Sequence, residues 1–304
     1  MMVPVDTLHS RRLAASTARH AVRSLHAELT LYPKPGLVSL VDAGSHADMN
    51  AATFLRSLFA LRGYFRSITS AGIDGASFSV LLILGQRAEQ RMLRATGGVN
   101  THRGAIFCLG LLCAATGLAR HRSKAHAPLT ATDLRRTLLD QWGPALTRHC
   151  TMRQPSAHGT GAAIVHGIGG ARAQAAAGMP ALFEHALPVL RATLAAGRGW
   201  ECARIDAFFT LLAVLDDTNI YYRGGADGAR LVQRHGEEFM ARGGTGDSAW
   251  KVTALNAHRL FIARRLSPGG AADLLAATCL VHHLTPEGAA PPSTLAPVLI
   301  HALP

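Results

Sequence analysis

The chain has 304 residues, a formal net charge of +12 at pH 7 and only 6% aromatic residues. A chain of this length can bury a large core in one domain or two, and the lack of a Pro/Ser-rich linker in its middle favours one. The positive charge attracts polyanions, which include nucleic acids, membrane surfaces and small phosphorylated ligands. The arginines are scattered, without an aromatic-interleaved basic strand, which argues against a surface that stacks bases.

The five cysteines form no C-x-x-C pair and no compact framework, which argues against structural zinc and against a secreted disulfide scaffold. No apolar signal-peptide stretch follows Arg11 and Arg12, so we expect a protein of the reducing cytoplasm. The segment Gly104–Ala119 carries no charge over its 16 residues, but it is short for a membrane span. We therefore predict a buried core helix there and no membrane association.

Apolar residues recur with a period near 3.6 from Leu8 to Leu31, which predicts the first helix. Further helices are predicted at Ala51–Tyr64, Phe78–Ala95, from Ala105 onward, Ala131–Arg148, Ala181–Ala196, Glu201–Asp216, Gly228–Ala241, Ala249–Leu266 and Ala271–Leu284. No alternating strand pattern is present, so the predicted class is all-α, a single-domain multi-helix bundle over residues 1–284. The proline-rich residues 285–304 are predicted to form an extended or disordered tail.

Two connections between these helices lack a helical period. Ser67–Ala76 is predicted to be a turn because of its glycines and Asp74. Arg153–Gly170 is rich in glycine and histidine, but it lacks the P-loop pattern and no strand precedes it, so an independent dinucleotide site is not expected there.

The first of two glycine-rich segments, Tyr32–Asn50, interrupts the helical pattern. Pro33 and Pro35 disfavour a helix there, and Gly36 permits backbone geometries that other residues resist. The segment carries one cation, two carboxylates and one imidazole, which are Lys34, Asp42, Asp48 and His46. This mixture suits an anionic ligand and its metal ion, and the alternative is a solvated loop of turn residues.

The second glycine-rich segment, Gly97–Gly104, opens directly onto the apolar helix predicted from Ala105. A glycine-flanked loop at a helix N-terminus presents free backbone N–H groups at the positive end of the helix dipole, an arrangement that binds phosphate. Arg103 adds a planar fork of donors for phosphate oxygens. His102 is either a ligand contact, which its polar setting favours, or a capping or core histidine.

Acidic residues recur near predicted helix C-termini, where the helix dipole disfavours negative charge. Glu28 is either a contact for magnesium or substrate, or a solvated surface residue. Glu89 leads into the second glycine-rich segment, where the alternative is an i,i+4 ion pair with a nearby arginine. Asp216 and Asp217 end an apolar helix, which indicates either a compensating cation or a hydrated helix end. Asp273 is expected to cap the last helix.

Short motifs follow one another in a fixed order along the chain. They are PKPGLV at Pro33–Val38, GSHADM at Gly44–Met49, GGVNTHRGAIF at Gly97–Phe107, DTN at Asp217–Asn219, RGG at Arg223–Gly225 and SPGGAADLL at Ser267–Leu275. In these motifs the chain resembles the triphosphoribosyl-dephospho-coenzyme A synthases, over roughly Ala21 to Leu284. The likeness is closer to the member that serves malonate decarboxylase than to the one that serves citrate lyase.

The resemblance implies an enzyme, a transferase that joins ATP to 3′-dephospho-coenzyme A and expels adenine. The 2′-hydroxyl of the acceptor replaces the base at the ribosyl anomeric carbon. A bond of this type breaks through a cation-like sugar, so the site needs carboxylates near the ring and a base near the incoming hydroxyl. The predicted catalytic residues are Asp217, for metal or transition-state charge, and His46 or Asp48, for the base.

The same resemblance implies a nucleotide cleft between the glycine-rich loops. The predicted nucleotide and phosphate contacts are Lys34, Gly36, Asn100, His102, Arg103, Asn219 and Arg223. Mg²⁺ is the expected cofactor, with candidate ligands at Glu28, Asp42, Asp48, Glu89 and Asp217. The product is expected to pass to a carrier-protein transferase of the malonate decarboxylase system.

Two other function classes stay open. One is a helical hydrolase of N-glycosidic or ADP-ribosyl bonds, in which water replaces the coenzyme A hydroxyl. The other is a basic helical protein that binds nucleic acid with a steep salt dependence, which the scattered arginines disfavour. The sequence leaves the oligomeric state open, with a homodimer as one alternative.

Overall fold

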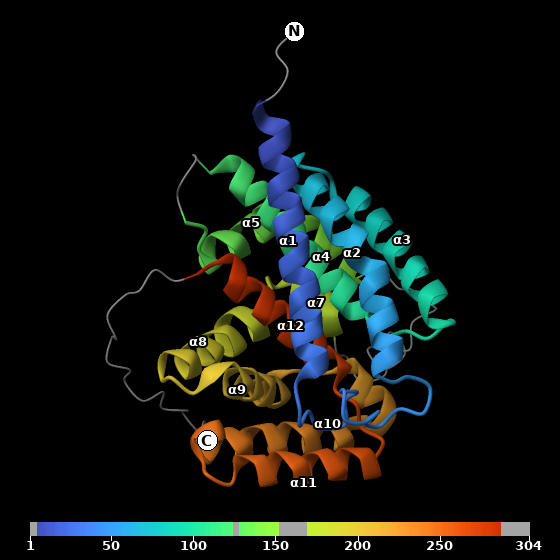
Figure 1. Cartoon of the computed structure of the whole chain (residues 1–304), viewed down its shortest axis with the longest axis vertical. Coiled ribbons are helices and arrows are strands. Elements are labelled where there is room, and N and C mark those ends of the chain that lie inside the picture. The colour runs from blue at the N-terminus through green and yellow to red at the C-terminus, as the bar shows by residue number, and fades with distance from the viewer. Residues whose placement is uncertain (1–4, 124–127, 152–168, 287–304) are drawn as a thin grey trace.

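The computed structural model describes residues 5–123, 128–151 and 169–286, and all regular structure within these ranges is helical. Figure 1 shows the helices, which in chain order are α1 (Val5–Thr30), α2 (Ala51–Ile73), α3 (Phe78–Thr96), α4 (Arg103–Arg122), α5 (Ala131–Thr151), α7 (Gly170–Ala176), the π-helix η1 (Ala181–Ala186), α8 (Leu187–Ala195), α9 (Gly199–Val214), α10 (Thr218–Ala241), the 3₁₀-helix η2 (Gly244–Gly246), α11 (Trp250–Ala263) and α12 (Gly269–Leu284). The predicted all-α class is confirmed.

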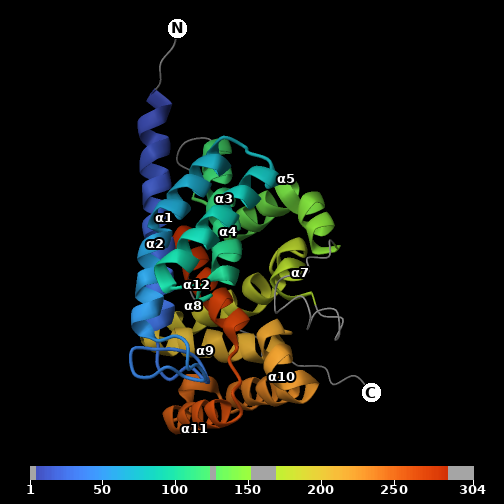
Figure 2. The same ribbon diagram turned by 90° about the vertical axis from the view of Figure 1, so that its right-hand side faces the viewer.

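The helices pack as two groups that share one connecting helix. In the first group α2 packs against α1, α3 and α4, and in the second α9 packs against α8 and α10. α12 contacts α1 and α4 of the first group and α9 of the second, and Figures 1 and 2 show it between them. Buried apolar residues of both groups belong to one continuous core cluster. The N-terminus of α12 therefore lies where the two groups meet.

α4 is the core helix of the first group. It is long and apolar enough to cross a membrane by length and composition alone, but most of it is buried against other helices. Small residues allow that packing, because a Cβ on Gly72 of α2 would lie 2.0 Å from the carbonyl oxygen of Ala114 on α4. The predicted core helix is thus confirmed.

Two predicted boundaries are wrong. α2 continues to Ile73 instead of ending before the predicted turn Ser67–Ala76, because Ile68 and Ile73 are buried. α10 begins at Thr218 rather than Gly228, with the chain kinked at Gly225, where φ is 61° and ψ is −161°. In α2 burial outweighs the local preference of glycine to end a helix, whereas Gly225 interrupts the helical backbone of α10.

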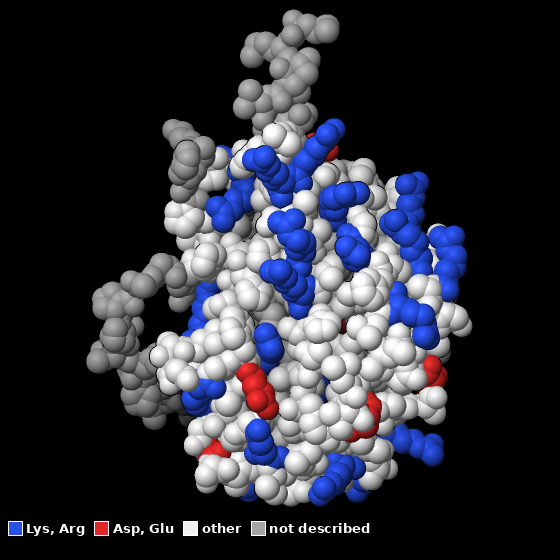
Figure 3. All heavy atoms as spheres, in the orientation of Figure 1, with Lys and Arg blue, Asp and Glu red and all other residues white. Residues whose placement is uncertain are grey.

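Figure 3 shows one face of the molecule, on which Lys and Arg far outnumber Asp and Glu and are spread over the surface. Exposed arginines of α1 that follow its length are Arg11, Arg12, Arg19 and Arg23. The Gly/His-rich segment, except for its last two residues, and the tail beyond Pro286 lie outside the described residues.

Candidate active site

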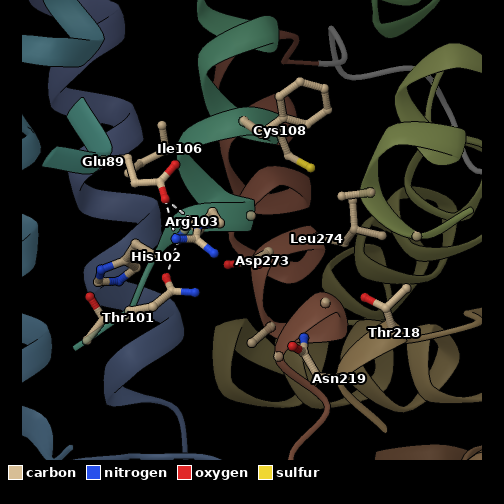
Figure 4. A pocket seen from close by; sticks show the side chains of 18 of the residues that line it. Glu89, Thr101, His102, Arg103, Ile106, Cys108, Thr218, Asn219, Asp273 and Leu274 are labelled. Carbon is tan, nitrogen blue, oxygen red and sulfur yellow. Dashed lines mark hydrogen bonds and ion pairs between the residues drawn. The ribbon is translucent and has the colours of Figure 1, made fainter. Parts of the chain in front are cut away.

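A cavity of about 930 Å³ opens between the two helix groups. Its walls include the N-terminal ends of α4, α10 and α12 together with both glycine-rich segments. Most predicted site residues line it, namely Glu28, His46, Asp48, Glu89, Asn100, His102, Arg103, Asp217, Asn219 and Arg223. Figure 4 shows Arg103, His102 and Asp273 near the start of α4, with Asn219 across the cavity from them. Lys34, Gly36 and Asp42 lie outside this lining.

Asp217 lies at the positive ends of two helices, not at the negative end of one as the sequence indicated. α9 ends at Val214, and Asp217 is the N-cap of α10. Its Oδ1 accepts a hydrogen bond from the Asn219 backbone N–H at 2.9 Å, and its Oδ2 accepts one from the Ala271 N–H of α12 at 3.1 Å. Burial raises the pKa of Asp217, while these N–H groups act to lower it. Asp216, by contrast, is exposed.

Asp273 does not cap its own helix, so that prediction is wrong. Pro268 is the N-cap of α12, whereas Asp273 reaches across to the N-terminus of α4 and accepts a hydrogen bond from the Ala105 N–H. A Cβ on Gly104 would lie 2.1 Å from Asp273 Oδ2, so this approach requires glycine. Burial, and then the nearby carboxylates of Glu28 and Asp217, raise the pKa of Asp273 well above its usual value.

Glu28 is buried at the edge of the cavity, and its ion-pair partner is Lys34. The two side chains form a close ion pair, with Lys34 fully enclosed by protein. Burial lowers the pKa of Lys34 and raises that of Glu28, and each partner opposes the shift of the other. The chain itself therefore supplies the cation near Glu28, and the side chain of Lys34 points to Glu28 from outside the cavity lining.

His102 is the N-cap of α4 and is 3% exposed. Its Nδ1 lies 2.6 Å from Ser57 Oγ, whereas its Nε2 has no hydrogen-bond partner in the described part of the chain. Burial, with a smaller contribution from Lys34, lowers the pKa of His102 to about 3, so the ring is neutral at neutral pH. His102 therefore offers one unpartnered ring nitrogen in the lining of the cavity.

Arg103 and Glu89 form an ion pair that joins α4 to α3. The pair spans two helices, so it is not the i,i+4 contact considered as the alternative for Glu89. Asn100 Oδ1 accepts a hydrogen bond from the Arg103 backbone N–H at 3.1 Å, which fixes the start of α4. Part of the Arg103 side chain stays exposed beside the first turn of the helix.

His46, Asp48 and Arg223 meet at another wall of the cavity. His46 Nδ1 lies 3.3 Å from the Arg223 guanidinium and 3.5 Å from Asp48 Oδ1, and its Nε2 lies 2.7 Å from Ser267 Oγ. Because arginine only donates, Nδ1 accepts and Nε2–H donates to Ser267. Burial, and next Arg223, lower the pKa of His46, while Asp48 opposes them, so the ring is neutral at pH 7.

Asp42 and Gly36 shape the first glycine-rich segment from outside the cavity. Asp42 Oδ2 lies 3.0 Å from His258 Nε2, and its Oδ1 accepts from the Gly44 N–H at 2.8 Å. Gly36 has a φ of +71°, and a Cβ there would lie 2.1 Å from the Leu266 carbonyl oxygen. These contacts hold the segment against α11 and the loop that follows it.

The described residues contain no group of three or more His, Cys, Asp or Glu side chains arranged to hold a metal ion. The oxygens of Asp217 already accept backbone hydrogen bonds, and Asp42 is bound to His258. Mg²⁺ usually binds through one or two carboxylates plus phosphate oxygens. The residues therefore fit a Mg²⁺ ion that is held mainly by a phosphorylated ligand, with the exposed Asp48 as a protein contact, and not a preformed metal cage.

The fold and cavity define an all-α protein whose site is assembled where helix N-termini and carboxylates converge. The chain belongs to the ATP:dephospho-CoA triphosphoribosyl transferase family, whose model matches residues 14–291, and it is an enzyme of that transferase class. The resemblance drawn from its motifs is thereby confirmed.

Curated relatives agree with this family. The chain is 38% identical to the 2-(5″-triphosphoribosyl)-3′-dephosphocoenzyme-A synthase of Pectobacterium atrosepticum over 88% of the chain and 89% of that relative. It is 36% identical to a probable synthase of the same name from Azotobacter vinelandii, over 96% of the chain and 99% of the relative. No solved structure matches the chain.

Sequence reasoning missed three contributors to the site. Asp273 belongs to the SPGGAADLL motif, which was a signal that it does more than cap a helix. Ser267 begins the same motif and holds His46. Ser57 holds His102 from within a regular helix, and no local pattern marks it.

Proposed function

We propose that this protein transfers the 5-triphosphoribosyl group of ATP to the 2′-hydroxyl of 3′-dephospho-CoA and releases adenine. The family model and the names of the relatives support these substrates and this product. The observation that carries the proposal is the approach of three carboxyl groups, Glu28, Asp217 and Asp273, within one cavity beside the N-terminus of α4.

This arrangement suits a reaction at the anomeric carbon of ribose. The bond from C1′ to N9 of ATP breaks, the bond from C1′ to the acceptor 2′-oxygen forms, and the hydroxyl proton ends on adenine. Negative charge on Asp217 stabilises the cation-like ribosyl group as the base departs, and the developing cation opposes the rise in the pKa of Glu28 and Asp273, so that it favours their ionised forms. Neutral His46, in the same lining, is in the protonation state that a base toward the hydroxyl requires. The exposed Asp48 supports the charge that His46 then acquires.

The triphosphate stays intact in this reaction and must be bound without cleavage. The start of α4 offers backbone N–H groups, and Arg103 and Arg223 add fixed positive charge. Bound Mg²⁺ would neutralise part of the polyphosphate charge. Lys34 contributes through its ion pair with Glu28 rather than by direct phosphate contact.

The test is adenine release from ATP and Mg²⁺, with and without 3′-dephospho-CoA. The transferase releases adenine only when both substrates are present. Equal release without the acceptor would instead identify a hydrolase of the N-glycosidic bond. No release in either mixture would contradict both readings and favour a binding protein.

We further propose that the product is the precursor of the malonate decarboxylase prosthetic group and passes to a carrier-protein transferase in the cytoplasm. The motif likeness supports the first part. All five cysteines lie in the described part of the chain and none is in a disulfide, which suits a reducing compartment. Deleting the gene and assaying the carrier of malonate decarboxylase for its prosthetic group tests the assignment, and a fully modified carrier would contradict it.

A further inference from the structure

The cavity has a second, apolar end that the proposed reaction does not explain. Its wall is built by side chains of α3, α4 and α5, which are Phe78, Leu81, Leu82, Phe107, Leu111 and His149. His149 makes an edge contact with Phe78 at a centroid distance of 5.3 Å and lies 6.1 Å from Phe107. Three rings and three leucines thus form one continuous apolar surface.

One face of α4 connects this end to the charged end. Arg103, Phe107 and Leu111 all line the cavity, and their spacing of four residues places them on the same side of the helix. The helical rise puts Leu111 about 12 Å beyond Arg103. The cavity therefore runs from charged to apolar surroundings along a single helix.

The polar groups at the apolar end are neutral. Burial, and next Arg172, lower the pKa of His149, so its ring is uncharged at pH 7. Burial raises the pKa of the Cys108 thiol, which stays protonated. The charge that acts on His149 belongs to Arg172 of α7, which also lines the cavity. This end suits a long, weakly polar group and does not suit a polyphosphate.

The substrates of the proposed reaction differ in which of their chemical groups can reach the apolar end of the cavity. Both adenines are attached directly to the two riboses that react, so both lie within one sugar of the carboxylates. The triphosphate of ATP reaches farther but is strongly charged. The pantetheine chain of dephospho-CoA is separated from its ribose by a diphosphate, so it is the one weakly polar group that extends that far.

We propose that the apolar end between α3, α4 and α5 binds the pantetheine chain of the acceptor and so selects dephospho-CoA over shorter adenine nucleotides. This inference rests on the proposed function. Arg103 lies at the charged end, where α4 begins, and its positive charge serves the diphosphate that links ribose to pantetheine as well as the triphosphate of ATP. Phe107 is the central side chain of the wall because it contacts His149 and lies between Arg103 and Leu111 on α4.

The test compares two ligands by calorimetric titration and, where they react, by adenine release. One ligand is dephospho-CoA, and the other is the β-methyl ester of ADP, which keeps the nucleoside and the diphosphate diester but lacks pantetheine. The variants are Phe107→Ala and, on a separate helix, Phe78→Ala. The matched control is Phe59→Ala, an exposed phenylalanine of α2 outside the cavity.

Phe107→Ala should weaken the binding of dephospho-CoA about tenfold or more, and leave that of the methyl ester and the KM for ATP within about twofold. Phe78→Ala should act in the same direction, and Phe59→Ala should change neither ligand. An equal loss for both ligands in both cavity variants, or a rise confined to the KM for ATP, would overturn the inference. If the unaltered enzyme released no adenine from ATP and dephospho-CoA, the proposed function would fail instead.

Discussion

Two carboxylates deep in this protein have opposite surroundings. Asp206 accepts hydrogen bonds from Thr193 Oγ1 at 2.8 Å and from the Thr245 N–H at 2.7 Å, and pairs with Arg198 at 3.2 Å. Asp273 faces the cavity with Glu28 and Asp217 near it, and these like charges together with burial raise its pKa. A carboxylate surrounded by donors stabilises the fold, whereas carboxyl groups that face one another raise its free energy and indicate a functional site.

The cavity carboxyl groups and Asp206 should respond differently to substitution, and the largest expected effect is the loss of activity in Asp217→Asn. The change removes the negative charge that the reacting ribose requires, and it keeps an acceptor oxygen for one of the two helix N-termini while an amide nitrogen replaces the other acceptor. We expect turnover to fall about 10²- to 10³-fold, measured as adenine release with both substrates. Near-normal turnover, with unaltered folding by circular dichroism, would remove Asp217 from the proposed charge stabilisation.

Asp206→Ala should destabilise the fold and leave the activity nearly unchanged, which is the reverse of Asp217→Asn. Removal of its carboxylate leaves Arg198 and two threonines without their shared acceptor. Since Arg198 is partly exposed, we expect a loss of about 3 kcal/mol in the free energy of unfolding, at the low end for a broken buried pair. Urea denaturation measures this, and the activity of the folded fraction should stay within about twofold. A selective loss of activity without destabilisation would contradict the structural role.

Gly104→Ala tests the approach of α4 to Asp273. The new Cβ would collide with Asp273 Oδ2, so we expect destabilisation of about 1 to 3 kcal/mol in denaturant titrations together with reduced adenine release. The control is Gly63→Ala, at an exposed helical position of α2 where a Cβ meets nothing within 4 Å. That change should stabilise the protein by about 0.5 to 1 kcal/mol. Equal effects of the two substitutions would show that Gly104 is not in close contact.

The pH dependence of the free energy of unfolding should show a smaller effect that arises from the carboxyl group of Asp273. An acid whose pKa is higher in the folded than in the unfolded state favours folding when protonated, and this contribution falls as pH rises above the unfolded value. For Asp273 the decline begins near 3.8 and continues up to its raised folded pKa. Asp273→Asn should lack this decline, so its stability relative to the natural protein should increase from pH 4 toward neutrality. A constant difference would place Asp273 in a less repulsive environment.

The fold class and the charged part of the cavity lining follow from the sequence because they depend on local signals. Apolar periodicity indicates the helices, and glycine-rich segments that begin a helix predict where anions bind. The direction of Lys34 could not be read in this way, since proline and glycine around it indicate a loop but not that its side chain turns inward to Glu28. The same limit applied to Asp217, whose hydrogen bond to Ala271 joins residues 54 positions apart.

The apolar end of the cavity was invisible in the sequence for a related reason. Phe78, Phe107 and His149 belong to three helices and have the spacing of ordinary core residues. Only the packing of α3, α4 and α5 around one space distinguishes them from the rest of the core.

The most direct test of the central claim, that the three carboxyl groups of the cavity carry out ribosyl transfer, is the mass spectrum of the product formed by the natural enzyme and by Asp273→Asn. Both are incubated with ATP, Mg²⁺ and 3′-dephospho-CoA. We expect a product with the summed mass of the two substrates less adenine from the natural enzyme, and almost none from the folded variant. The same product in equal yield from Asp273→Asn would contradict it.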